Sequence, residues 1–329
     1  GMINLNGGQG NADGAAGYPG SLYVGPKSST PAVALSLTSG TLILDTGGSW
    51  SHSSGLRGKG QVTSNFIENA GSRFGYSVCR FQFTEFSIGS DVVVDVRGEN
   101  ALFLEVSGNV SVGSDISLDG KTGQQGIYSG KGGPGGWASG RSLRNTEEFS
   151  NLHPALNGQG PGGGRGYEIG KSTGGGSYGG VGTGGLSGGV PGLVYGDNLI
   201  EDLVGGSGGG HAIRGSGNAG GGGGAISFVV GGNFILESNS TISANGGSGT
   251  SHYDGSGAGG SGGAIRIEAS SITNFGSIHA KGGDALGDST LAGAGGGGRI
   301  ALLSDGAISE GDVNASGGQN FSLIHSTYR

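Results

Sequence analysis

The chain has 329 residues, of which 84 are glycine and 7 are proline; 12% are charged, and the formal net charge is −7. This composition borders on low-complexity disorder, but the low charge and the clustered apolar residues argue for a folded chain. Collagen is excluded because glycine does not recur at every third position and proline is scarce. Nucleic acid and anionic membranes are not expected partners, because the balance is acidic and no run of Lys or Arg occurs.

Cys79 is the only cysteine, so the sequence offers no intrachain disulfide and stability must come from burial and backbone hydrogen bonds. No stretch approaches the length of about eighteen apolar residues that membrane insertion requires. The N-terminus lacks the basic and apolar regions of a secretory signal, and Gly1-Met2 resembles the scar of a cleaved tag. We therefore expect an excised piece of a larger polypeptide or assembly, or a leaderless protein.

The first segment, residues 1–120, is rich in apparent β-strands. Alternating or apolar runs predict strands at residues 32–37, 41–45, 76–88 and 91–97. Most of the phenylalanines of this segment fall within or close to these runs, which indicates a wide core or a capping layer. No glycine tandem separates the runs, so we expect further strands of the architecture that the C-terminal segment predicts.

The second segment, residues 121–224, has the highest glycine content and the weakest periodicity. Ordering glycine costs more conformational entropy than ordering any other residue, so isolated glycine loops are not expected to hold a fixed structure. Glycine also lets two backbones approach closely. The segment is therefore predicted to be a long excursion of extended glycine chains, hydrogen-bonded side by side and packed on the strands.

The third segment, residues 225–329, contains an internal repeat. Residues 264–283 match residues 299–318 at a constant offset of 35. Residues 225–247 form an earlier copy with an insertion of three residues, and residues 101–120 form a fainter one. Each copy alternates apolar and polar residues, as strands with one buried face do.

One such unit cannot bury its apolar face alone, so successive units are expected to stack on a shared core. Residues 225–230, 233–236 and 241–244 predict three short strands in a coil of about twenty residues, which favours a right-handed parallel β-helix over a propeller blade. The fold class is therefore predicted to be all-β, a solenoid with long glycine-rich inserts. The three segments, 1–120, 121–224 and 225–329, are expected to form one continuous domain.

Three recurring strings carry a family resemblance: Gly-Gly-Ala-Ile-Arg-Ile, Gly-Ser-Ile-His-Ala-Lys-Gly-Gly and Gly-Gly-Gly-Gly-Arg-Ile-Ala-Leu. They resemble the glycine-rich β-helical repeats of large surface and adhesin-like proteins, over residues 225–318 and more weakly over 101–120. The glycine-dense residues 156–224 also resemble the polyglycine sandwiches of phage tail-fibre adhesins. The resemblance implies an extracellular or cell-surface protein that binds a surface glycan or a partner protein, without a catalytic signature.

Enzymes are the main alternative, because parallel β-helices often carry polysaccharide lyases and glycoside hydrolases. These reactions need carboxylates that converge in one groove. Asp197, Glu201 and Asp202 form the best local cluster, and we interpret them first as solvated loop carboxylates. Three or more acidic or basic side chains in a groove on one face would favour the enzyme.

Five aromatic residues are the candidate ligand-binding residues: Trp50, Trp137, Tyr178, Tyr195 and Tyr253. They lie in glycine-rich, apolar-poor surroundings, so we expect exposed rings on which sugars could stack. The alternative is that each ring packs over bare glycine backbone as a local plug.

No metal site or cofactor is expected, because the six histidines show no metal-ligand spacing and a single cysteine does not suit zinc. Ca²⁺ is the one cation that the sequence leaves open. Four carboxylates fall near glycine turns and could serve it: Asp119, Asp254, Asp284 and Asp305.

Overall fold

The computed structural model describes residues 32–123, 129–141, 154–168, 172–212, 218–252, 255–287 and 292–322. The described residues belong to one compact unit, residues 32–329. These residues form strands β1 to β21 and one short 3₁₀ turn, Pro154–Leu156, with no α-helix among them. None of their helical segments is long and apolar enough to cross a membrane.

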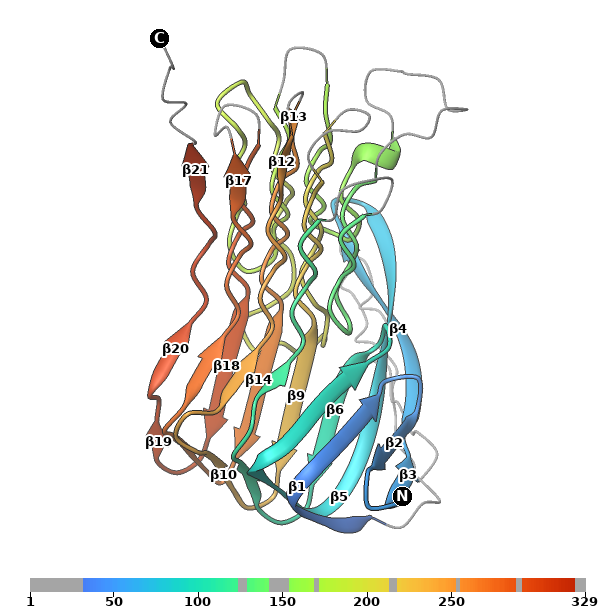
Figure 1. Cartoon of the computed structure of the whole chain (residues 1–329), viewed down its shortest axis with the longest axis vertical. Helices are drawn as coiled ribbons and strands as arrows, with labels where there is room; N and C mark the ends of the chain where they lie inside the picture. Colours follow the sequence, from blue (N-terminus) through green and yellow to red (C-terminus); the bar gives the residue numbers. More distant parts are fainter. Residues whose placement is uncertain are drawn as a thin grey trace, which may run out of the picture. The chain divides into compact units, whose positions relative to one another are not determined.

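Two mainly parallel sheets hold most of the strands, as the sequence repeat predicted (Figure 1). The larger has thirteen strands, and each pair along its main path is parallel. The smaller is a four-stranded parallel sheet. The path of the larger sheet is β18 (Arg299–Ser304), β14 (Ala264–Ala269), β9 (Ala225–Val230), β6 (Ala101–Val106), β5 (Ser72–Arg97), β7 (Val110–Val112), β10 (Asn233–Leu236), β15 (Ser271–Asn274) and β19 (Ile308–Ser309). The smaller sheet runs β20 (Asp312–Asn314), β16 (Ser277–His279), β11 (Thr241–Ser243) and β8 (Ile116–Ser117).

Twelve of the strands fall into four triplets that follow the sequence repeat: β6-β7-β8, β9-β10-β11, β14-β15-β16 and β18-β19-β20. Between the last two triplets, Ile265 pairs with Ile300 and Ile278 with Val313, both at the predicted offset of 35. Between the second and third, the offset falls from 39 at Ile226–Ile265 to 36 at Ile242–Ile278. The three inserted residues are therefore absorbed in the turns, and the apolar faces stay in register.

The N-terminal strands differ from the prediction. Residues 76–88 and 91–97 belong to one strand, β5, and residues 33–45 form one strand, β1 (Val33–Asp45), which pairs with β5 in parallel. Three further strands are antiparallel: β2 (Ser49–His52), β3 (Arg57–Lys59) and β4 (Gln61–Asn69). We expected only more parallel strands, and this antiparallel edge is a correction. Its strands are hairpin-connected, with left-handed glycines such as Gly48 and Gly71 at the turns.

The core lies between the strands of the stacked triplets. Equivalent residues such as Leu102, Ile226 and Ile265 form apolar ladders with no exposed surface. The rings of Phe228 and Phe234 pack edge-on, with their centroids 5.2 Å apart. Burying each such side chain is worth about 1.5–3 kcal/mol. This core holds the β-half of the fold together.

Each triplet continues into glycine-rich chains that run beyond the sheets, drawn in Figure 1 as the thin ribbons above the arrows. We call the described chains of this kind the glycine lattice. They comprise residues 118–123, 129–141, 157–166, 172–180, 204–212, 218–224, 244–250, 257–263, 280–284 and 292–298. The lattice includes both the excursion within residues 121–224 and the inserts of the C-terminal repeats.

The backbone hydrogen bonds of the lattice have a period of three residues. Successive N–H groups of chain 257–263 donate in turn to carbonyls of chains 244–250, 207–210 and 293–296. Chain 220–225 repeats this pattern with its own three neighbours. A three-residue period is that of a polyproline II helix, whose backbone groups point outward in three directions. The extended glycine chains therefore hydrogen-bond side by side, which confirms the prediction for the inserts.

Close packing, more than backbone conformation, requires glycine in the lattice. A Cβ at Gly263 would lie 1.9 Å from the carbonyl oxygen of Gly224, and one at Gly222 would lie 2.0 Å from that of Gly206. Neither Gly263 nor Gly222 has a left-handed φ. A side chain would push neighbouring chains apart and break their hydrogen bonds.

Candidate functional site

A groove of about 790 Å³ lies where the end of β5 faces the first chains of the glycine lattice. Its lining comes from both ends of β5, from the turn after this strand and from the segment around Trp137. The lining residues are Gly75, Tyr76, Ser77, Val96, Arg97, Gly98, Glu99, Ser117, Asp119, Lys121, Ser129, Lys131, Gly132, Gly133, Pro134, Gly135, Gly136, Trp137, Ala138 and Gln159.

Trp137 supplies an aromatic wall of the groove. The lattice holds its backbone, since its N–H donates to Gly206 and its carbonyl accepts from Gly222. Its ring packs over Gly160, where a Cβ would come within 2.8 Å, and meets the ring of Tyr195 edge-on at 6.1 Å. The ring is half-buried, so it is fixed on the protein side while part of it borders the groove.

Tyr76 provides a second ring, on β5. Its hydroxyl donates a hydrogen bond of 2.6 Å to Asp202. Burial, followed by the bond to the Asp202 carboxylate and its charge, raises the pKa of Tyr76 well above its ordinary value. The phenol therefore stays protonated and its orientation is fixed.

Charged side chains of both signs line the same groove. Glu99, Lys121 and Lys131 are exposed, and none forms an ion pair within the described part of the chain. Arg97 pairs with Asp95 on its own strand, and the Asp119 carboxylate accepts the N–H of Asn245 at 2.6 Å. The groove thus offers polar side chains beside an aromatic wall.

Three of the five aromatic candidates are buried, which corrects the expectation of exposed rings. Trp50 is 6% exposed, Tyr178 0% and Tyr195 5%. The rings of Tyr178 and Tyr195 are 4.8 Å apart, and the Tyr195 hydroxyl donates to the carbonyl of Gly205, so both act as plugs in the glycine lattice. Trp50 packs against Phe83 in the sheet core. Tyr253 lies outside the described residues, which leaves Trp137 as the aromatic candidate that borders the groove.

The carboxylates Asp197, Glu201 and Asp202 do not line the groove. The Asp197 carboxylate accepts the backbone N–H groups of Leu199 and Glu201, and so holds its own turn. Asp202 is engaged by Tyr76, and Glu201 is exposed. This arrangement agrees with the interpretation of these residues as loop carboxylates.

Two arginines hold that turn against the sheet. Arg299 donates to the side chain of Asn198 at 2.6 Å and to the carbonyl of Tyr195 at 3.0 Å. Arg266 donates to the carbonyl of Leu199 at 3.2 Å. Ile200 within the turn has φ of +55°, a strained value for a β-branched residue.

Sequence reasoning missed Glu99, Lys121 and Lys131. No motif marks them, and the fold brings them together from two segments that follow different strands. The one signal was the Asp119-Gly120 turn, which lies directly before Lys121. The proximity of Lys121 to Glu99 depends on how the glycine lattice packs on β5, which the sequence does not indicate.

Within the described ranges, no group of three or more His, Cys, Asp and Glu side chains could hold a metal ion. Asp119 and Asp284, two of the calcium candidates, each accept a backbone N–H from a neighbouring chain. Asp305 is exposed, and Asp254 lies outside the described residues. Calcium binding by these carboxylates stays a prediction.

Comparison with protein-family models, with curated proteins and with solved structures gives no match. The resemblance to surface and adhesin-like repeats therefore rests on the repeat pattern, together with the large parallel sheets.

Proposed function

We propose that this chain is a right-handed parallel β-solenoid with a structural or adhesive role at a cell or particle surface. It binds a surface glycan, or a partner protein, through its glycine-rich side. The observation that carries the proposal is the groove at the edge of the glycine lattice, which Trp137 and exposed charged side chains line together. The triplet repeat supports a long, regular scaffold that presents this groove.

The chemistry of the groove suits a sugar chain. Aromatic rings present an apolar face on which a pyranose can stack, and hydroxyls need donors and acceptors nearby. Trp137 supplies the ring, and Glu99, Lys121, Lys131 and Gln159 supply polar groups. We place the protein outside the cell or at its surface, as part of a larger polypeptide or assembly, without a role in nucleic-acid binding or membrane insertion.

A glycan array tests this proposal. We expect the protein to bind a subset of glycans and Trp137→Ala to lower affinity at least tenfold, whereas Phe275→Ala, an exposed ring that does not line the groove, leaves it unchanged. Because Trp137 also packs on Gly160, Lys131→Ala provides a second test at an exposed position. Absence of binding on the array, or binding unaffected by both groove variants, would count against the proposal.

A polysaccharide-cleaving enzyme is the second candidate, and one observation favours it. Glu99, Asp119, Lys121 and Lys131 line a single groove, the feature that we expected of an enzyme. Incubation with pectin, alginate and other polysaccharides tests for bond cleavage. If the wild type and Glu201→Gln release products and Glu99→Gln does not, the enzyme becomes the preferred function.

A further inference from the structure

Two apolar ladders end in exposed residues in the last triplet, one on β19 and one on β20. Ile272 is 1% exposed, but Ile308, the next residue of its ladder, is 40% exposed. Ile278 is 0% exposed, but Val313, which follows it, is 37% exposed. We call the face formed by β18, β19 and β20 the terminal edge. It is the same kind of face that each earlier triplet buries against its successor.

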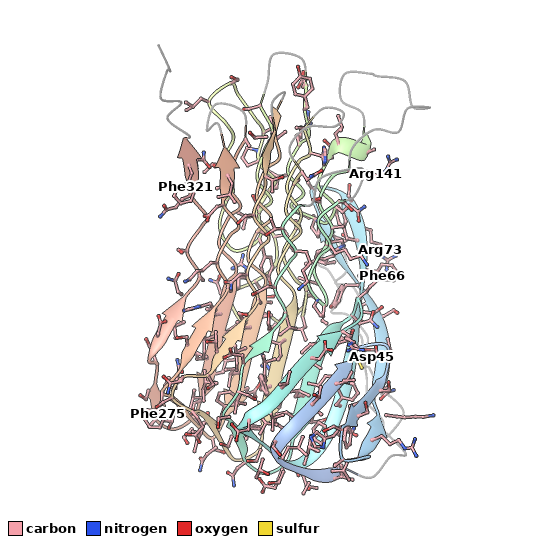
Figure 2. The ribbon with its side chains drawn as sticks, in the orientation of Figure 1. Asp45, Phe66, Arg73, Arg141, Phe275 and Phe321 are labelled. Atoms are coloured by element: carbon pink, nitrogen blue, oxygen red, sulfur yellow. The ribbon has the colours of Figure 1, made fainter. Side chains whose placement is uncertain are left out.

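The opposite end of the stack is covered. There β2 pairs with β1 in the antiparallel direction and β3 follows it. Leu42 and Leu44 on β1 have no exposed surface, and Trp50 on β2 closes over Phe83. The two ends therefore differ: one carries an aromatic cap, and the other leaves the ladder residues Ile308 and Val313 exposed. Figure 2 shows Phe321, a residue of β21 (Asn320–Ser322) that is 45% exposed, at the outer edge of the fold.

Six of the hydrogen bonds between successive levels of the stack share one arrangement. A side-chain oxygen on the earlier level accepts a backbone N–H from the later level, at 2.6–2.9 Å. The donor follows its acceptor in each of six pairs: Glu85 and Asn109, Asn109 and Asn233, Asp115 and Thr241, Asp119 and Asn245, Asn245 and Lys281, Asp284 and Gln319.

The terminal edge carries acceptors suited to this scheme. Asp312 occupies the position that Asp115 has three levels earlier. Asp115 accepts the N–H of Thr241, Thr241 pairs with Ser277, and Ser277 pairs with Asp312. Its Oδ2 accepts from Ser277 and from His279, while its Oδ1 accepts from no residue that the structure describes. The edge therefore combines exposed aliphatic residues with a carboxylate acceptor for a backbone N–H.

We propose that the terminal edge docks a further strand triplet, supplied by a different polypeptide with the same glycine-rich repeat. The incoming segment adds parallel strands to β18, β19 and β20, places aliphatic side chains over the open ladders and donates backbone N–H groups to Asp312. Addition of a strand to an exposed sheet edge is a common mode of protein recognition. This docking is separate from ligand binding in the groove, because it involves another surface.

A second copy of this chain fits the terminal edge poorly. Two copies related by a twofold axis would bring the same face together, with Asp305, Glu310 and Asp312 of each copy close to those of the other. A head-to-tail arrangement would offer the β1–β2–β3 face, whose antiparallel cap does not continue the parallel ladders. A different polypeptide with an unpaired strand triplet would meet neither the like-charge contact nor the antiparallel cap.

A synthetic peptide of residues 264–283, which contains one complete triplet, is the probe. We expect it to bind the wild-type protein, and the double substitution Ile308→Lys with Val313→Lys to weaken binding at least tenfold. The double substitution Val62→Lys with Val93→Lys alters two exposed valines on β4 and β5, away from the edge, and serves as the matched control. Asp312→Asn is expected to weaken binding less, because it removes charge and keeps an acceptor oxygen.

Two further measurements make the result decisive. A peptide with Ile265→Asp and Ile278→Asp is expected not to bind, since its own ladder residues are lost. Circular dichroism checks that each protein variant retains the fold of the wild type. No binding by the wild-type protein, or equal binding by the edge and control variants, would overturn the proposal. If the wild type self-associates and the edge variant does not, the occupant is a second copy of this chain, and the proposal is overturned as well.

Discussion

The sheet half and the glycine lattice are stabilised in opposite ways, although the same repeat encodes both. In the sheets, large side chains such as Phe228 fill a core from which water is excluded. In the lattice, the absence of side chains lets backbones approach so closely that a Cβ at Gly222 would come within 2.0 Å of a carbonyl oxygen. One half needs side-chain volume and the other needs none, so removing volume from the first and adding volume to the second should both destabilise the protein.

The largest effect is expected from removing volume in the sheet half. Phe228→Ala leaves a cavity in the stacked core and should lower the free energy of unfolding by about 3–5 kcal/mol. Phe275→Ala is the matched control, because that ring is 62% exposed and should cost little. Denaturant unfolding followed by circular dichroism measures both. Similar losses for the two variants would show that the sheet core is not tightly packed.

Adding volume to the lattice is expected to come next. A Cβ at Gly282 would lie 2.2 Å from the carbonyl oxygen of Gly295, so Gly282→Ala should destabilise the protein by about 1–3 kcal/mol through overpacking. Gly317 occupies the equivalent repeat position, where the nearest contact would be 3.4 Å. Gly317→Ala is therefore expected to be tolerated. Equal melting temperatures for the two variants would contradict close packing in the lattice.

Polar groups in the lattice offer a smaller test. The Tyr195 hydroxyl donates to the carbonyl of Gly205, so Tyr195→Phe leaves a buried acceptor without this bond and should cost about 1–3 kcal/mol. The Tyr178 hydroxyl is buried and has no hydrogen-bond partner among the described residues. Tyr178→Phe should therefore be neutral or stabilising. Thermal unfolding of the two variants compares them, and a loss at Tyr178 as large as that at Tyr195 would refute the assignment.

The parallel half of the fold could be predicted because its periodicities are local. The offset of 35 and the alternation of Ile265 and Ile267 fix strand direction and register before any contact is known. Side-by-side glycine chains followed from the entropy of isolated loops. The sequence did not predict which glycine chains become neighbours, because glycine carries no side chain that specifies a partner. The pairing of these chains is what forms the groove.

The aromatic candidates show the same limit. Glycine-rich surroundings implied that Tyr178 and Tyr195 had no core to enter, but the lattice is itself a dense interior that buries both. The antiparallel cap around Trp50 was missed because its strands are short and polar, without an alternation that distinguishes a hairpin from a parallel strand.

The smallest expected effect at neutral pH concerns Cys79, which probes the interior of the sheet half. Burial, with the Asp45 charge as a lesser cause, raises the pKa of its thiol to about 12 from an ordinary value of 9.0. Below pH 9 the thiol is protonated in both the folded and the unfolded chain, so it adds no pH dependence. As pH rises from 9 toward 12, the unfolded chain loses this proton while the folded chain keeps it, and stability falls. Cys79→Ala should reduce this alkaline loss, and a thiol reagent at pH 8 should label the native protein only after unfolding. Rapid labelling of native protein would show that the ladder around Cys79 opens to water.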